Sequence, residues 1–193
     1  MANETFKDIE KLEADLWEAA DNLRANSKLT SSDYFMPVLG VIFLRHAANR
    51  FEAAARQIAA DHVGGKMPKR KVLPADYIAR RSLFLPETAR YDWIMEQAAT
   101  RGSDLPRLVT EAMTAIESEF PPLAGEPSKD YGIFEPKVLE DLMRLFNSER
   151  IKEATGDVFG RIYEYFSPSS PSRRRTTTAS SSPPRRSCRR SST

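Results

Sequence analysis

The most concentrated set of side chains able to do chemistry follows two glycines, in the run Lys66-Met67-Pro68-Lys69-Arg70-Lys71. Four cations in six residues can neutralise several phosphates of a nucleic-acid backbone without recognising bases. The preceding Gly64-Gly65 is typical of a helix end and lacks the Gly-x-x-x-x-Gly-Lys-Ser/Thr spacing of a phosphate-binding loop. We predict nucleic-acid contacts by Lys66, Lys69, Arg70 and Lys71, and a merely solvated loop is the alternative.

The residues that usually bind metals are few and unsuitably spaced. His46 and His62 are the two histidines, and they are sixteen positions apart, while the one cysteine is Cys188. This spacing supports neither a zinc pair on one helix face nor an intramolecular disulfide. No Ser-His-Asp set, carboxylate pair or glycine-rich nucleotide motif stands out. We predict no catalytic, cofactor-binding or metal-binding residue in this chain.

Helices must position these side chains, because apolar residues recur every three or four positions through the first 166 residues. The run 38–44 is apolar on every face and predicts the central core helix, within a helix over about 33–62. The other expected helices cover about 4–25, 74–81, 86–99, 105–120, 136–146 and 155–166. Without an alternating strand pattern or an internal repeat, the sequence predicts an all-α fold of about six or seven helices.

Three details of these helices can be checked against a structure. Pro37 is tolerable in the first turn of its helix, after an N-cap among residues 31–33. The arginines of the first two helices are expected to form salt bridges; they are Arg24, Arg45, Arg50 and Arg56. The glycine pair Gly156 and Gly160 could allow a neighbouring helix to approach closely.

The chain consists of two unlike parts. Residues 167–193 contain seven arginines, no acidic residue and almost only Ser, Arg, Thr and Pro, whereas the first 166 residues carry 22 basic and 27 acidic residues. The formal net charge of +2 therefore combines about −5 in the body with +7 in the tail. The tail has no side chains from which to build a core. We predict a helical domain over 1–166 and a disordered tail over 167–193.

The N-terminal residues lack the basic start and apolar run of a secretion signal, and no stretch approaches about 20 apolar residues, the length of a membrane span. We expect a soluble, cytoplasmic protein that does not interact with membranes.

Several stretches occur in a characteristic order: LWEAADNLR at 16–24, Tyr34, VLGVIFLR at 38–45, RFE at 50–52 and GRIYEYF at 160–166. Together they resemble the N-terminal helical domain of type I restriction-modification DNA methyltransferase subunits, over about residues 4–166. The resemblance implies a modification subunit that methylates adenine at N6 with S-adenosylmethionine. It implies a specificity subunit, a second modification subunit and, in the full complex, a restriction subunit as partners, with this domain helping to close the complex around DNA.

In that family, catalysis belongs to a following Rossmann-like domain with an Asn-Pro-Pro-Phe or Asn-Pro-Pro-Tyr motif that holds a flipped adenine. This chain has Pro-Pro at 121–122 and 183–184, and neither pair follows an asparagine. We therefore expect it to bind no cofactor and to be inactive by itself unless another chain supplies the catalytic domain. The alternative function is a stand-alone helical DNA-binding adaptor that uses the basic loop and the arginine-rich tail.

A single-nucleotide frameshift is our hypothesis for the origin of the tail. With one nucleotide restored after Phe166, codons can be chosen for residues 167–193 so that the same bases encode Gly-Glu-Phe-Phe-Thr-Pro at the position where the family carries that motif. A genuine arginine-rich tail that binds nucleic acid is the competing interpretation. The sequence of the gene distinguishes the two.

Overall fold

The computed structural model describes residues 14–15, 18, 21, 30–68, 70–100, 103–153 and 156–166. Within these ranges there are helices and no strand, which confirms the predicted all-α fold. The elements are α2 (Ser31–Val63), α3 (Pro74–Ile78), η1 (Glu87–Ala89), α4 (Tyr91–Ala98), α5 (Leu105–Glu119), η2 (Pro121–Leu123), η3 (Tyr131–Ile133), α6 (Pro136–Phe146), α7 (Glu149–Lys152) and α8 (Gly156–Phe166), where η marks a 3-10 helix. The predicted tail over 167–193 and most of the predicted helix over 4–25 lie outside the described residues.

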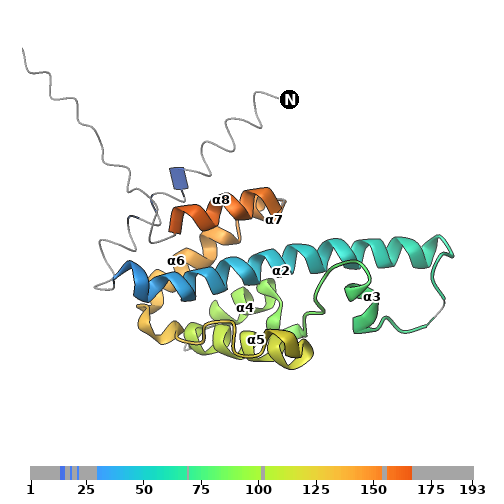
Figure 1. Ribbon diagram of the computed structural model, residues 1–193, viewed down its shortest axis with the longest axis horizontal. Helices are drawn as coiled ribbons and strands as arrows, with labels where there is room; N and C mark the ends of the chain where they lie inside the picture. The colour runs from blue at the N-terminus through green and yellow to red at the C-terminus, as the bar shows by residue number, and fades with distance from the viewer. Residues whose placement is uncertain are drawn as a thin grey trace, which may run out of the picture.

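The long helix α2 is the axis of the fold (Figure 1). At 33 residues it is about 50 Å long. It packs against α8, α4 and α6, and Val38, Val41 and Leu44 in its N-terminal half are fully buried. Residues 38–44 are thus the central core segment that the sequence predicts. Beyond that core, the C-terminal end of α2 extends past α8 and α5, accompanied by α3 (Figure 1).

The start of α2 differs from the prediction. Thr30 is the N-cap residue, and the Asp33 carboxylate accepts hydrogen bonds from the Thr30 backbone N–H at 2.8 Å and from its hydroxyl at 2.7 Å. Because the helix begins at Ser31, Pro37 lies in its second turn and not in the first. Pro37 is buried there, so this turn of the helix lacks the backbone hydrogen bond that proline cannot donate while the ring lies in the core.

The single helix expected over 86–99 is wrong, because the chain forms η1 and α4 with an extended residue, Arg90, between them. This break directs Tyr91 into the core, where its hydroxyl donates a hydrogen bond of 2.9 Å to the carbonyl of Met143. In a continuous helix, the direction of the Tyr91 side chain would be set by the period of 3.6 residues and not by its contact with Met143. The tertiary contact with α6 therefore overrides the local helix signal.

Arg45 connects α2 to the rest of the core through a completely buried side chain (0% exposed). Its guanidinium donates to Asn49 Oδ1 at 2.8 Å, to Asn147 Oδ1 at 3.2 Å and to Glu52 Oε1 at 2.9 Å. The same group lies 4.8 Å from the centre of the Tyr91 ring. The expected salt bridge of Arg45 is confirmed, and its full set of partners is what makes burial of this charge tolerable.

The close approach of helices occurs at a different glycine from the one expected. A Cβ added at Gly160 would meet no atom of the described residues within 4 Å, so no described helix approaches closely there, and the prediction for Gly156 stays untested. A Cβ at Gly40 would lie 2.1 Å from the hydroxyl oxygen of Tyr131. Gly40 is therefore the position at which α2 makes room for another element. None of the described helices is long and apolar enough to cross a bilayer.

Candidate nucleic-acid interface

The basic run predicted to contact nucleic acid lies in the α2–α3 loop, residues 64–73. Gly64 caps α2, its N–H bonding to the carbonyl of Ala60 at 2.8 Å, and Gly65 adopts a φ of 68°. The Lys66 N–H then bonds to the carbonyl of Asp61 at 2.9 Å. These bonds satisfy carbonyls at the end of α2 and turn the chain away from its axis, so the predicted helix stop at Gly64-Gly65 is confirmed.

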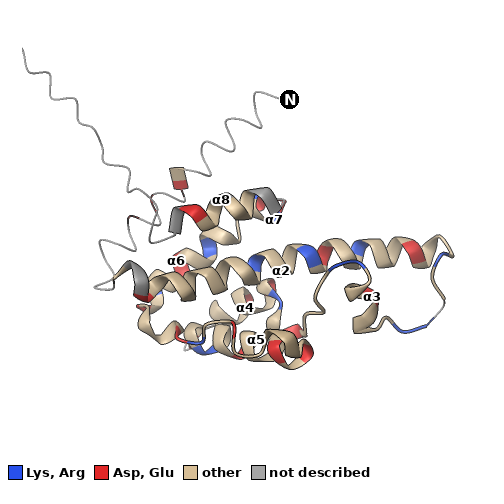
Figure 2. Cartoon of the chain, viewed as in Figure 1, with Lys and Arg blue, Asp and Glu red and all other residues tan. Residues whose placement is uncertain are grey.

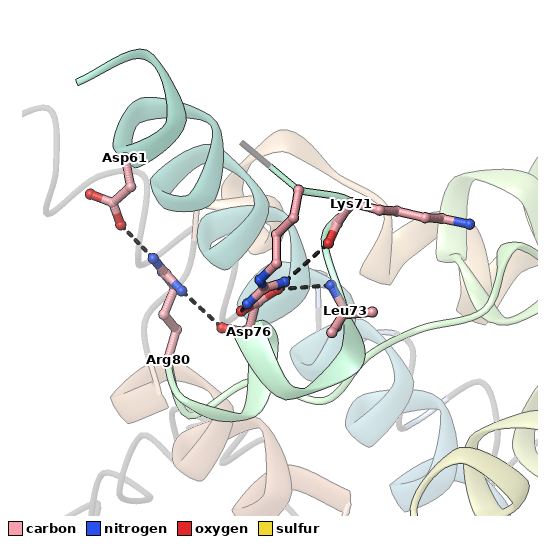
Figure 3. Close-up of polar contacts among 6 residues, drawn as sticks. Asp61, Lys71, Leu73, Asp76 and Arg80 are labelled. Atoms are coloured by element: carbon pink, nitrogen blue, oxygen red, sulfur yellow. Dashed lines mark hydrogen bonds and ion pairs between the residues drawn. The ribbon is translucent and has the colours of Figure 1, made fainter. Parts of the chain in front are cut away.

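An arginine and an aspartate hold the middle of the loop against α3 (Figure 3). Two nitrogens of Arg70 donate to the two carboxylate oxygens of Asp76, at 2.7 and 2.8 Å, and Arg70 also donates to the carbonyl of Lys71 at 3.0 Å. The Asp76 carboxylate accepts a further hydrogen bond of 2.8 Å from the backbone N–H of Leu73, which caps the start of α3. The Arg70 side chain is thus an internal brace.

These bonds change the acidity of Asp76. The hydrogen bonds from Arg70 and from the Leu73 N–H, with the charges of Arg70 and Arg80, lower the pKa of Asp76 to about 2 against the opposing effect of burial. The carboxylate raises the pKa of Arg70 in return. Both groups are therefore ionised across the neutral range, and the brace persists there.

A second arginine fastens α3 to the end of α2 (Figure 3). Arg80 forms an ion pair with the carboxylate of Asp61 on α2 and donates a hydrogen bond of 2.9 Å to the backbone carbonyl of Asp76. Between them, Arg70 and Arg80 engage the two carboxylates of this end of the molecule. The loop is consequently a positioned element with a fixed anchor on each side.

The four predicted cations have different fates. Lys66 and Lys71 are exposed, and neither forms an ion pair with any residue that the structure describes. Arg70 is exposed at one edge but directs its donors to Asp76. Lys69 lies outside the described residues. Lys66 and Lys71 are therefore the described cations of the loop that can meet a phosphate, and phosphate contact by all four residues stays a prediction.

Other exposed cations near the loop were assigned to salt bridges by the sequence analysis and not to this interface. Arg50, for which a salt bridge was expected, donates instead to the backbone carbonyl of Arg81 at 2.9 Å. Arg56 also forms no ion pair with the described part of the chain, and Arg24 is not among the described residues. Figure 2 shows basic positions along the C-terminal half of α2, in the loop and in the connector after α3. The signal that could have revealed them is the excess of cations over carboxylates in this segment.

Exposed apolar side chains accompany these cations. Val63 at the end of α2 is 93% exposed, Leu73 before α3 is 47% exposed and Ile78 at the end of α3 is 52% exposed. Large apolar groups left in water at one end of a molecule are typical of a surface that another protein covers. The end of α2 therefore offers positive charge and apolar area together.

The two histidines lie on α2, where one packs against a neighbouring helix and the other lies in the last turn. The His46 ring packs at 4.7 Å from the Phe159 ring of α8, and burial together with the charge of Arg50 lowers its pKa. His62 lies in the last turn of α2, as predicted. Among the described residues, no three His, Cys, Asp or Glu side chains come together as a metal site requires.

The chain is similar to known proteins of one family. The model of the HsdM N-terminal domain family matches residues 12–146 of the chain. A curated relative, the type I restriction enzyme MjaIX methylase subunit of Methanocaldococcus jannaschii, is 27% identical over 185 residues, which cover 86% of this chain and 32% of the relative. The chain thus spans about a third of the length of that relative. No solved structure matches this chain.

Proposed function

The chain belongs to the HsdM N-terminal domain family, and from this premise we propose that it is the docking part of a type I modification subunit, which joins a specificity subunit and DNA without transferring a methyl group. The relative is named a methylase subunit, and a subunit of that kind works in an assembly. Within the proposed assembly the partners are the specificity subunit, a second modification subunit and, in the full complex, a restriction subunit.

One observation carries this proposal: the C-terminal end of α2 extends beyond the core and presents cations and apolar side chains together. Lys66 and Lys71 supply charge without an internal partner among the described residues, and Val63 is almost wholly exposed. Exposed cations and exposed apolar side chains at this end add nothing to the packing of the domain itself. Both a protein surface and a phosphate backbone are chemically suited to cover it.

We assign S-adenosylmethionine and adenine-N6 methylation to the catalytic domain of a full-length subunit. The chain's own contribution in this proposal is mechanical, because Arg70 and Arg80 hold the loop and α3 rigidly on α2. In this proposal the C-terminal end of α2, the α2–α3 loop and α3 form a rigid arm, and a partner bound to this arm is held in a fixed position relative to the core. Docking by the arm therefore fixes the distance between the specificity subunit and DNA.

The first test is assembly. The chain is mixed with its cognate specificity subunit and analysed by size-exclusion chromatography with light scattering. We expect a stable complex, and separate elution at micromolar concentration overturns the docking proposal. Adding a separate catalytic fragment and labelled S-adenosylmethionine tests the division of labour: methyl transfer to DNA should require that fragment, and transfer by the chain alone contradicts it.

The second test concerns the predicted nucleic-acid contacts. Lys66, Lys69 and Lys71 are replaced together by alanine, while Arg70 is replaced separately because its loss also breaks the bond to Asp76. We expect the triple variant to keep its thermal stability and to bind a DNA duplex more weakly, with a salt dependence reduced by about 0.9 in slope per lost phosphate contact. Lys137→Ala on α6 is the control. Unchanged DNA affinity of the triple variant removes the loop from the interface.

The alternative, a stand-alone DNA-binding adaptor, is favoured by the same exposed cations. It is distinguished by DNA binding of the chain in the absence of the specificity subunit. Tight binding by the chain alone, together with failure to form the complex, would support the adaptor and reject the docking domain.

A further inference from the structure

Arg81, three residues after the end of α3, has a backbone conformation that its side chain does not explain. Arg81 has a φ of 57°, and it is the one non-glycine residue with a positive φ in the described part of the chain. The N–H of Arg81 bonds to the carbonyl of Ile78 at 2.9 Å, and the N–H of Ser82 bonds to the carbonyl of Tyr77 at 3.0 Å. This pair of bonds is the usual helix ending in which glycine occupies the left-handed position.

Glycine adopts this conformation without steric cost, whereas a Cβ at the same position crowds the backbone. The fold gains no compensating contact from the Arg81 side chain among the described residues, because that side chain is exposed and forms no ion pair there. The adjacent Arg80 differs, since it pairs with Asp61. Backbone strain that does not stabilise the fold is a feature of functional sites, and here the strained residue carries an exposed guanidinium.

A second arginine contacts the backbone of the same residue. Arg50 on α2 is exposed, and its terminal nitrogen donates to the backbone carbonyl of Arg81 at 2.9 Å. Neither arginine has a carboxylate within ion-pair distance among the described residues. The hydrogen bond ties the Arg50 guanidinium to the backbone of Arg81, so two arginines without a described carboxylate partner belong to one turn, and an anion bound there would be attracted by both charges.

We propose that Arg50 and Arg81 form a binding site for a phosphodiester group of the nucleic-acid backbone. Each guanidinium is a planar fork of donors that matches the oxygens of a phosphate. The loop cations Lys66 and Lys71 come before α3 and Arg81 comes after it, so positive groups flank both ends of this helix, which is about 7 Å long. A backbone that follows α3 meets cations at more than one phosphate. This inference rests on the proposed DNA contact and names where it occurs.

The test uses two substitutions with opposite effects on the backbone. Arg81→Gly removes the charge and relieves the left-handed strain, whereas Arg81→Gln removes the charge and keeps the Cβ. We expect Arg81→Gly to match or exceed the thermal stability of the wild-type chain. Both variants should lose about tenfold in affinity for DNA, as expected for one charge-assisted contact. A stability decrease in Arg81→Gly, or different DNA affinities of the two variants, overturns the proposal.

Binding is measured by fluorescence anisotropy with a short labelled DNA duplex, for the chain in complex with its specificity subunit and for that subunit alone. The slope of log affinity against log salt should fall by about 0.9 in each Arg81 variant and in Arg50→Gln, and should not change in Lys137→Ala, an exposed cation of α6. Wild-type slopes in the variants reject the Arg50–Arg81 site and leave the proposed function standing. If the wild-type chain adds nothing to the DNA affinity of the specificity subunit, both are rejected.

Discussion

Gly40 is the position at which the smallest change should disturb the core most. An added Cβ would lie 2.1 Å from the Tyr131 hydroxyl oxygen and 3.3 Å from the ring carbon that bears it. Tyr131 is fully buried, and its hydroxyl has no hydrogen-bond partner among the described residues, so the ring cannot move away from an added Cβ without disturbing its packing. Gly40→Ala therefore forces the ring and η3 away from α2 by more than an ångström.

The change in the free energy of unfolding on Gly40→Ala is the difference between two opposing effects. Overpacking of this severity costs up to about 3 kcal/mol, and replacing a helical glycine by alanine returns about 1 kcal/mol. We expect Gly40→Ala to lower the free energy of unfolding by about 2 kcal/mol. Tyr131→Phe removes the clashing oxygen and an unpaired buried hydroxyl, so it should be neutral or stabilising by about 1 kcal/mol. The double variant should be at least as stable as the wild-type chain.

Urea unfolding followed by circular dichroism measures all four proteins. The coupling between the two substitutions should be about 2 kcal/mol and favourable. Gly160→Ala is the matched control, because a Cβ at this helical glycine meets no atom of the described residues within 4 Å, and it should be stabilising by about 1 kcal/mol. Additive effects of Gly40→Ala and Tyr131→Phe would refute the argument from the 2.1 Å contact.

Three further predictions follow from the charged groups. Because the pKa of Asp76 is lowered, the stability it provides is complete above its ordinary value of 3.8 and is lost as pH falls through about 2; the melting-temperature gap between wild type and Asp76→Asn should close over this range, and a constant gap would contradict it. The pKa of His46 is also lowered, so stability should decline as pH falls below 6.5, and this decline should be absent in His46→Phe when melting temperature is measured against pH. Arg45→Met leaves Glu52 without its buried partner and should cost about 3 kcal/mol in urea unfolding; a loss below about 1 kcal/mol would show that the network contributes little.

Helices whose boundaries are set by local chemistry could be predicted from the sequence. The helix over 136–146 has the predicted bounds, because Pro136 is suited to a first turn and the apolar spacing continues to Phe146. The long helix was predicted within two residues at each end, since Gly64-Gly65 supplies its stop. The break at Arg90 could not be predicted, because it allows a contact between Tyr91 and Met143, which lies 52 residues further along the chain.

The position of the candidate interface followed from the charge pattern, but the state of each cation did not. The capture of Arg70 requires Asp76 to lie at the start of α3 with its carboxylate already fixed by the Leu73 N–H. That arrangement exists once the turn after Pro68 is formed, and no spacing rule describes it. The left-handed conformation of Arg81 was equally hidden, because sequence rules assign such a position to glycine.

The distribution of charge explains how an acidic domain can attract DNA. The first 166 residues carry a net charge of about −5, yet residues 50–90 contain nine Lys or Arg against four Asp or Glu, a local net charge of +5. Three of those four carboxylates, on Glu52, Asp61 and Asp76, are already engaged by arginines. Charges separated by more than about 8 Å are largely screened at physiological salt, and α2 is about 50 Å long. A phosphate backbone placed against the C-terminal end of α2 therefore experiences the local positive charge and not the acidic total, and raising the salt concentration should weaken that attraction while leaving the buried contacts of Arg45 in place.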